Sequence, residues 1–272
     1  NSKANKVGWF LALFPSLVLY SVLTMREVYI SFFFLVAIYG IVSWYRTPSI
    51  YWIVLAIFGF VAGSFFHGAM SVGALVFIFF ICLKNFIQFF KLLITNRINI
   101  KNFIITSVML FVLLLYFTNK IGAPKIGNFQ DAIDMSRLTN IMKSSSRGDA
   151  AYPDWLQINS IDEFIYKSPI RTIYFMFSPF PWDVRKMSHL IGTMDSILYL
   201  TLFYLIFKNR KVIWKEPDLR VIFIILLSYF FVFGIGVGNF GTSIRHRSKF
   251  VIGLILLAAP FFPKIVLQKK KN

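Results

Sequence analysis

Long apolar runs separated by short polar segments constrain this sequence more than any other feature. A helix needs roughly 18–20 mostly apolar residues to cross a bilayer, and several runs approach that length. The sequence therefore predicts an all-α, polytopic transmembrane helical bundle with about eight spans. The expected spans are 7–23, 28–44, 50–65, 68–83, 102–118, 189–207, 219–237 and 250–267. Pro15 is expected to kink the first span.

The composition agrees with a membrane protein and argues against other classes. Hydrophobic residues make up 57% of the chain, which has 33 phenylalanines and a formal net charge of +18. The basic residues are scattered between the apolar runs, where lipid headgroups and membrane orientation explain them better than nucleic acid does. With one cysteine, Cys82, and three histidines, neither a disulfide framework nor a zinc site is expected. We predict no metal and no cofactor.

The distribution of lysine and arginine predicts the orientation of the chain. If the N-terminus is cytoplasmic, every segment expected on that side is net positive, as the positive-inside rule requires. The outer face then carries the turns at 26–27 and 66–67, the stretch 119–188 and the segment 238–250, and both termini of this chain are cytoplasmic. Because the chain begins with Asn1 and not with Met, further helices are expected before it.

These expectations divide the chain into three parts. Residues 1–118 hold the first five transmembrane helices, and residues 189–272 hold the last three. Between them, residues 119–188 form one large outer loop. Within the first part, residues 84–95 have two readings: an amphipathic helix in the inner headgroup layer, or a simple extension of the fourth span.

The outer loop contains short predicted elements. Helices are expected near 129–142 and at 161–167, the second ended by Pro169. Residues 170–182 are apolar but too short, and too often interrupted by proline, to cross a bilayer. They predict a re-entrant or interfacial segment.

A basic cluster directly precedes the last apolar run. It consists of Arg245, His246, Arg247 and Lys249. Positive charge is normally disfavoured in a short outer loop, so its concentration here requires a reason. A guanidinium is a permanently charged, forked donor that matches phosphate oxygens, and histidine changes protonation near neutral pH. We expect an anionic ligand here, phosphate above all; anchoring of the eighth span is the alternative.

Two more polar groups are expected on the same face. Arg26 and Glu27 join two spans with almost no loop, and ionised residues beside spans usually face a cavity or a partner. Glu27 is the one acid in a short outer turn, which makes it a candidate base or a partner for Arg245 or Arg247. A self-neutralised hairpin is the alternative. His67 lies at another outer turn, either within a site or as an ordinary interfacial residue.

Further candidates lie in the long outer loop and in the sixth span. Among the loop arginines, Arg147, which precedes a Gly-Asp pair, is the most suggestive, whereas Arg171 and Arg185 are individually ordinary. Asp195 lies inside an apolar run and, as a buried acid, requires a partner. We expect Asp195 to form a structural hydrogen bond with that partner.

Together these residues resemble bacterial repeat-unit polymerases of the Wzy type, the integral membrane enzymes that build O-antigen and capsule polysaccharides. The resemblance rests on residues 14–16 with Arg26 and Glu27 at the end of the same span, on residues 178–182 in a large outer loop, and on residues 241–250 before the last span. Such polymerases usually have more than eight helices, which agrees with helices before Asn1.

The resemblance implies a glycosyltransferase of the bacterial inner membrane that uses no cofactor. Its substrate is an oligosaccharide on undecaprenyl diphosphate, and it moves the growing chain onto the next lipid-linked unit. The residues implied for diphosphate binding are Arg245, Arg247 and Arg147, with Arg26 and Lys249 counted beside them. His246 or Glu27 would be the base. Membrane lipids and a chain-length regulator protein are further implied partners.

Other functions stay open at this point. An O-antigen ligase, or another glycosyltransferase with the same lipid donor, differs only in its acceptor. A flippase or transporter of lipid-linked sugars predicts cations along a central cavity, whereas here they gather at one face. A passive structural membrane protein leaves the basic cluster unexplained.

Overall fold

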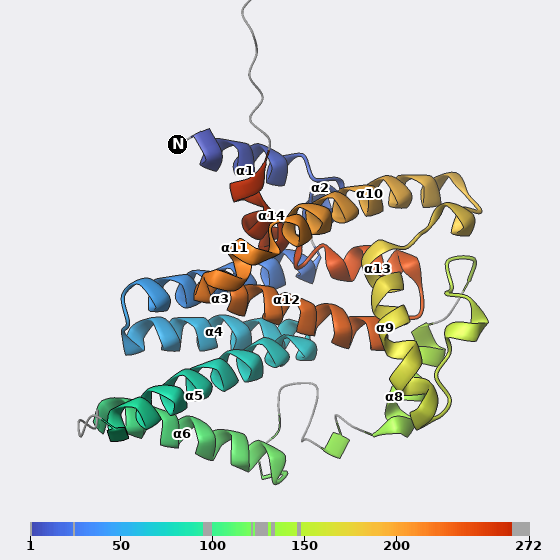
Figure 1. The fold of residues 1–272 in the computed structure, drawn as a ribbon. Coiled ribbons are helices and arrows are strands. Elements are labelled where there is room, and N and C mark those ends of the chain that lie inside the picture. The colour runs from blue at the N-terminus through green and yellow to red at the C-terminus, as the bar shows by residue number, and fades with distance from the viewer. Residues whose placement is uncertain are drawn as a thin grey trace, which may run out of the picture.

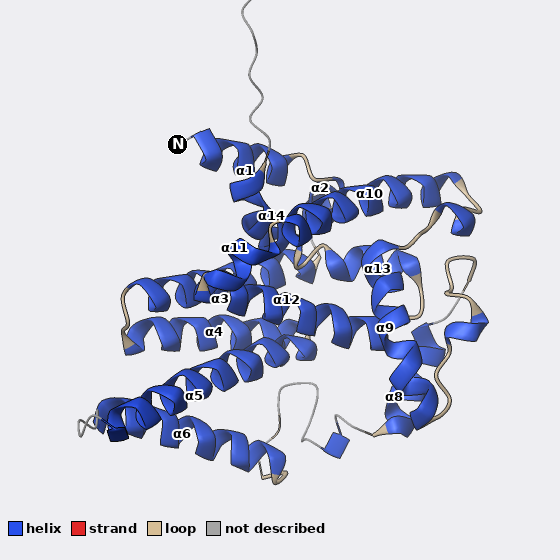
Figure 2. Ribbon diagram, in the orientation of Figure 1, coloured by secondary structure: helices blue, strands red, loops and turns tan. Residues whose placement is uncertain are grey.

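The computed structural model describes residues 2–23, 25–94, 100–120, 122, 130–131, 134–145 and 148–262. Across these residues the structure is all helical, without strands, apart from one isolated bridge between Ala151 and Asn239 (Figure 2). The predicted all-α class is confirmed.

The first half of the chain forms α1 (Ser2–Ala12), α2 (Pro15–Val22), α3 (Arg26–Arg46), α4 (Ile50–Phe66), the 3₁₀ turn η1 (Gly68–Met70), α5 (Ser71–Ile94) and α6 (Ile100–Phe117). The second half forms α8 (Met135–Ser145), η2 (Asp154–Leu156), α9 (Ile161–Phe177), η3 (Pro181–Asp183), α10 (Met187–Lys208), α11 (Arg210–Lys215), α12 (Pro217–Gly236), α13 (Phe240–Arg247), α14 (Val251–Ala258) and η4 (Ala259–Phe261).

Several of these helices have the length and composition to cross a membrane. Among the described residues, Arg26–Arg46, Gly68–Gln88 and Pro217–Gly236 meet both conditions, and the bent pair α1–α2 adds a fourth if it is one span. Ile50–Phe66, Ile104–Phe117 and Val251–Phe261 are apolar but shorter. This agrees with a multi-pass membrane protein. Three or four spans are supported, and the predicted count of eight stays a prediction.

The long helices lie side by side around one apolar core. In Figure 1, α3, α4 and α12 cross the middle of the molecule, α5 and α6 lie on one side of them, and α1 and α10 on the other. Phe34 of α3, Tyr229 of α12 and Phe250 meet in the core: the Phe250 ring centroid lies 5.6 Å from that of Phe34 and 4.6 Å from that of Tyr229. The start of α14 is thereby fixed against two long helices.

α3 and α4 approach each other closely at two glycines. A Cβ on Gly40 would lie 2.7 Å from the backbone nitrogen of Ala56, and one on Gly59 would lie 2.6 Å from the carbonyl oxygen of Phe33. Only the absence of a side chain allows this approach, as at many helix contacts in membranes.

We expect Gly59→Ala to lower the free energy of unfolding by about 1–3 kcal/mol, because the added methyl group overlaps the α3 backbone and forces the two helices apart. Gly8→Ala is the control, since nothing lies within 4 Å of a Cβ built at Gly8. Unfolding of the purified protein in detergent measures both. Equal stability of the two variants would contradict the close contact between α3 and α4.

The first predicted span is broken at Pro15. α1 and α2 meet at an angle of 59°, and Phe14 has extended backbone angles, φ −70° and ψ 119°. A proline clashes with a helical residue before it and drives that residue into the extended region. The kink predicted at Pro15 is confirmed.

Pro169 does not end a helix as predicted. α9 runs through it from Ile161 to Phe177. Proline removes the backbone donor to the carbonyl of Ile165. The hydroxyls of Ser168 and Thr172 donate to other carbonyls of the helix, those of Phe164 and Ser168, at 2.5 Å and 2.9 Å. The helix nevertheless continues, packed against α12.

Three further expectations can be compared with the helices. Residues 170–177 continue α9, which packs against α12, so 170–182 is not a separate element. Its re-entrant or interfacial position stays a prediction. α5 runs without a break to Ile94, which favours the extension of the fourth span over a separate amphipathic helix. The helix expected near 129–142 corresponds in part to α8.

Candidate functional site

α13 is a short helix whose sequence explains both of its ends. The side chain of Asn239 accepts hydrogen bonds from the backbone nitrogens of Gly241 and Thr242 and caps the first turn. Arg245, His246 and Arg247 fill the last turn, where the partial negative charge of a helix C-terminus favours cations. The basic residues are therefore presented by the end of a capped helix.

Six side chains from distant parts of the sequence gather around this helix end. We call them the polar cluster: Arg26, Glu27, His67, Arg245, His246 and Lys249. Glu27 lies in the first turn of α3 and is 3% exposed. Its Oε1 lies 3.1 Å from Arg245 Nε and 3.9 Å from Lys249 Nζ. The predicted pairing of Glu27 with Arg245 is confirmed, as an ion-pair contact without hydrogen-bond alignment.

His246 and Lys249 form a buried pair inside the cluster. Lys249 Nζ lies 2.6 Å from His246 Nδ1, and the two side chains share the ring of Phe233, over which Lys249 Nζ lies at 5.1 Å. Burial, and then the charge of Lys249, hold the pKa of His246 well below its ordinary value. Burial also lowers the pKa of Lys249, against the opposing effect of Glu27. Burial therefore favours the neutral imidazole of His246, whose Nδ1 contacts Lys249 Nζ.

His67 and Arg26 complete the cluster from α3 and from the end of α4. The His67 ring lies edge-on to His246 with 5.1 Å between the centroids. Arg26 is exposed, and its Nη1 lies 3.5 Å from the carbonyl oxygen of Phe66. Both residues act electrostatically on His246. The turns at 26–27 and 67, far apart in sequence, thus meet α13 at one end of the bundle, as predicted.

Arg245 is the cluster cation best placed to receive an anion. Its side chain is 33% exposed, and Glu27 contacts Nε, the nitrogen on the side of the guanidinium. The structure records no hydrogen bond within the described residues for the two terminal nitrogens. These are the donors that bind phosphate in a forked geometry.

Arg247 is hydrogen-bonded to protein groups, contrary to the predicted role in ligand binding. Its side chain is fully buried. The guanidinium donates to the carbonyls of Met176 and Ser178, to Asp195 Oδ2 at 2.9 Å and to Ser196 Oγ, and it lies 4.6 Å from the Tyr199 ring. It joins α13 to α9 and α10. Asp195 was predicted to need a partner, and the structure shows that this partner is Arg247.

Arg171 is also structural, and Arg185 lies apart from the site. Arg171 is 1% exposed and donates to the carbonyls of Leu156, Ile235 and Val237, so it holds the segment after α12 in place. Arg185 is exposed before α10. Arg147 lies outside the described residues.

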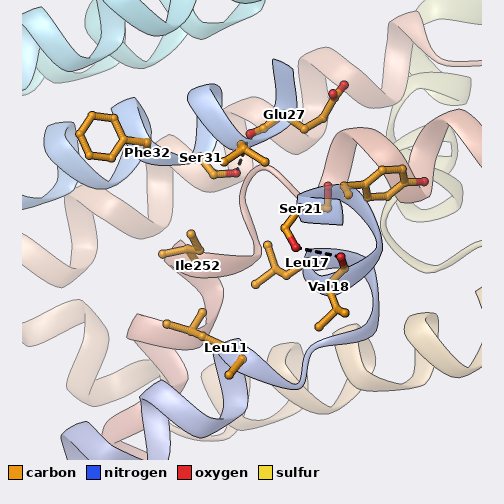
Figure 3. A pocket seen from close by; sticks show the side chains of 12 residues that line it. Leu11, Leu17, Val18, Ser21, Glu27, Ser31, Phe32 and Ile252 are labelled. Atoms are coloured by element: carbon orange, nitrogen blue, oxygen red, sulfur yellow. Dashed lines mark hydrogen bonds between the residues drawn. The ribbon is translucent and has the colours of Figure 1, made fainter. Parts of the chain in front are cut away.

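A cavity of about 350 Å³ adjoins the polar cluster. Its walls come from α1, α2, the first turns of α3 and the start of α14 (Figure 3). Most lining residues are apolar, and Glu27 lies at its rim. In Figure 3 the Glu27 carboxylate points away from the apolar side chains. The cluster and the cavity are therefore neighbours that share Glu27.

Neither this cavity nor the contacts of Phe233 could be predicted from the sequence. The one sequence feature that bears on the cavity is Pro15, because the break between α1 and α2 brings α2 against α3. Phe233 is one apolar residue among many in α12. Its contact with both Lys249 and His246 depends on tertiary packing.

In the part of the chain that the structure describes, no three His, Cys, Asp or Glu side chains are grouped to hold a metal ion. The chemistry available at this end of the bundle is that of guanidinium, ammonium, carboxylate and imidazole groups. Comparison with protein-family models, curated proteins and solved structures found no match to this chain.

Proposed function

We propose that this protein is a membrane glycosyltransferase that joins lipid-linked oligosaccharide repeat units into a surface polysaccharide. The observation that carries the proposal is the Arg245–Glu27 contact at the rim of an apolar cavity. The contact brings a partly exposed arginine and a carboxylate next to an apolar cavity. An amphipathic substrate with an anionic head, such as an oligosaccharide on undecaprenyl diphosphate, requires this combination.

The chemistry needs little more than these groups. The donor sugar already carries a diphosphate leaving group, so the sugar–phosphate bond breaks as an acceptor hydroxyl forms the new glycosidic bond. The terminal nitrogens of Arg245, with Arg26 nearby, would stabilise the charge that develops on the diphosphate. The proton of the acceptor hydroxyl would pass to Glu27 or to Nε2 of His246. No cofactor takes part.

The proposed setting is the inner membrane of a bacterium. The polar cluster would lie at the outer face and both termini of this chain in the cytoplasm, because that orientation puts the net-positive segments inside. Besides the lipid-linked oligosaccharide, membrane lipids and a chain-length regulator protein are the partners this setting implies.

Among the alternatives, the site disfavours a flippase. The cations gather at one end of the bundle, and Arg247 and Arg171 are tied to protein carbonyls and do not line a passage. An O-antigen ligase would use the same donor site with another acceptor, so the cluster fits both transferases. Only the identity of the acceptor distinguishes a polymerase from a ligase.

A surface-polysaccharide gel of a strain that lacks the gene tests the proposal. A polymerase predicts that the mutant carries a single repeat unit on its surface glycolipid and that the intact gene restores the ladder of longer chains. Polymer that accumulates on the lipid carrier without attachment would assign the protein as a ligase. A mutant with an unchanged ladder would overturn the proposed function.

A further inference from the structure

The cavity beside the polar cluster has the character of a site for a hydrocarbon chain. Its apolar lining includes Leu11, Leu17, Phe32 and Ile252 (Figure 3). At about 350 Å³ it falls in the range of roughly 300–1,000 Å³ typical of small-ligand sites. It is large enough for a segment of a lipid chain.

The serine hydroxyls that line the cavity are turned to the backbone. Ser21 Oγ donates to the carbonyl of Val18, Ser31 Oγ donates to that of Glu27, and Ser248 Oγ donates to that of Arg245. Figure 3 shows the first two of these bonds. Because each serine hydroxyl has a partner in its own segment, the serines offer little to a polar ligand. Tyr20 and Glu27 are the other polar lining residues, and the rest of the lining suits an apolar ligand.

The cavity is open towards exposed apolar side chains. Val18, Val28 and Phe32 belong to its lining, and each is more than 40% exposed. They lie on α2 and α3, and α3 is one of the helices with the length and composition to span a membrane. On such a helix, exposed apolar side chains face lipid. A chain could therefore enter from the bilayer without crossing water.

The charged residues beside the cavity indicate which lipid headgroup would bind there. Glu27 and Ser248 belong to the lining of the cavity, and Arg245 Nε lies 3.1 Å from Glu27 Oε1. Arg26 is the residue next to Glu27 in the sequence. A lipid whose chain fills the cavity would place its headgroup against these cations. The complementary headgroup is a phosphate or diphosphate.

We propose that the cavity formed by α1, α2, α3 and α14 holds the first part of the polyprenyl chain of the lipid diphosphate whose phosphates bind Arg245. This assignment rests on the proposed function and adds to it the location of the lipid tail. It gives the break at Pro15 a role, because α2, once turned from α1, closes one side of the cavity.

A matched pair of substitutions in α2 tests the assignment. Leu17 lines the cavity, whereas Leu19 does not and is 50% exposed. The full chain in lipid nanodiscs is titrated with undecaprenyl diphosphate, and binding is followed by native mass spectrometry. Leu17→Trp, which fills the cavity, should weaken binding about tenfold or more, since excluding two methylene groups has about that effect. Leu19→Trp should stay within about twofold of the wild type. Inorganic diphosphate should bind both variants equally.

Three results would overturn the assignment. Equal affinity of both variants for undecaprenyl diphosphate would show that the chain lies elsewhere. Equal competition by phosphatidylglycerol would make the cavity a general phospholipid site. A change of oligomeric state in Leu17→Trp alone, with lipid affinity unchanged, would assign the cavity to a helix of a second copy.

The binding assay is independent of the polysaccharide gel. A Leu17→Trp strain with a normal ladder and a variant protein with normal affinity would overturn the tail site and leave the proposed function intact. Loss of affinity in Leu17→Trp, together with a gene deletion that leaves the ladder unchanged, would overturn the polymerase function and keep the lipid site. Melting curves of both tryptophan variants control for misfolding.

Discussion

Arg247→Ala is expected to lower the free energy of unfolding by about 3–5 kcal/mol, the cost of removing one partner from a buried ion pair. The substitution leaves Asp195, which is 3% exposed, without its cation and removes the donor to the carbonyls of Met176 and Ser178. Chemical unfolding of the purified protein in detergent measures the change. Arg210→Ala, at an exposed arginine of α11, is the control and should change stability by less than about 0.5 kcal/mol.

A double substitution separates the two causes of the stability loss, the unpaired buried charge and the lost side-chain contacts. Arg247→Met with Asp195→Leu removes both buried charges and should recover part of the lost stability, because an uncompensated charge costs more than an apolar pair. Recovery stays incomplete, since the carbonyl of Met176 loses the Arg247 donor, whereas that of Ser178 keeps Ser196 Oγ. An Arg247→Ala protein as stable as Arg210→Ala would contradict the structural role assigned to Arg247.

Glu27→Gln is expected to abolish polysaccharide formation and to lower stability as well. The amide keeps the shape of the side chain but leaves Lys249, which is fully buried, without a carboxylate and releases Arg245. The free energy of unfolding should fall by about 3 kcal/mol. This is the lower end of the range for a broken buried ion pair, because Arg245 is partly exposed to solvent. If Glu27 accepts the proton, turnover falls about 10²–10⁴-fold.

The combination of Glu27→Gln with Lys249→Met distinguishes the two effects. Removing the buried ammonium should restore most of the stability, since no unpaired charge is left inside the cluster. Activity should stay lost if the carboxylate takes part in the reaction. A double variant that is both stable and active would limit Glu27 to a structural role and leave His246 as the proposed base.

Helix positions could be predicted where apolar content alone determines them. α3, α4 and α12 begin and end within two residues of the runs at 28–44, 50–65 and 219–237. The break at Pro15 followed from local backbone sterics. The course of α9 through Pro169 could not be predicted, because it depends on packing against α12.

The site could be predicted only in part, because the prediction used charge and sequence position without the direction of each side chain. Charge and position in the sequence brought Glu27 together with Arg245, and that pair exists. The same reasoning treated Arg247 as equivalent to Arg245, although side chains two residues apart on a helix point about 200° from each other. Once residues 240–247 are known to be helical, this geometry separates the exposed arginine from the buried one. The cavity needs the full tertiary arrangement.

The account depends most on Arg245 as the cation that binds the lipid-linked diphosphate. The most direct measurement is a surface-polysaccharide gel of the deletion strain carrying Arg245→Ala or, as control, Arg210→Ala, at matched protein levels. Loss of one such cation should reduce transfer about 10²–10³-fold. The account predicts a single repeat unit with Arg245→Ala and a full ladder with Arg210→Ala. A full ladder with Arg245→Ala would contradict it.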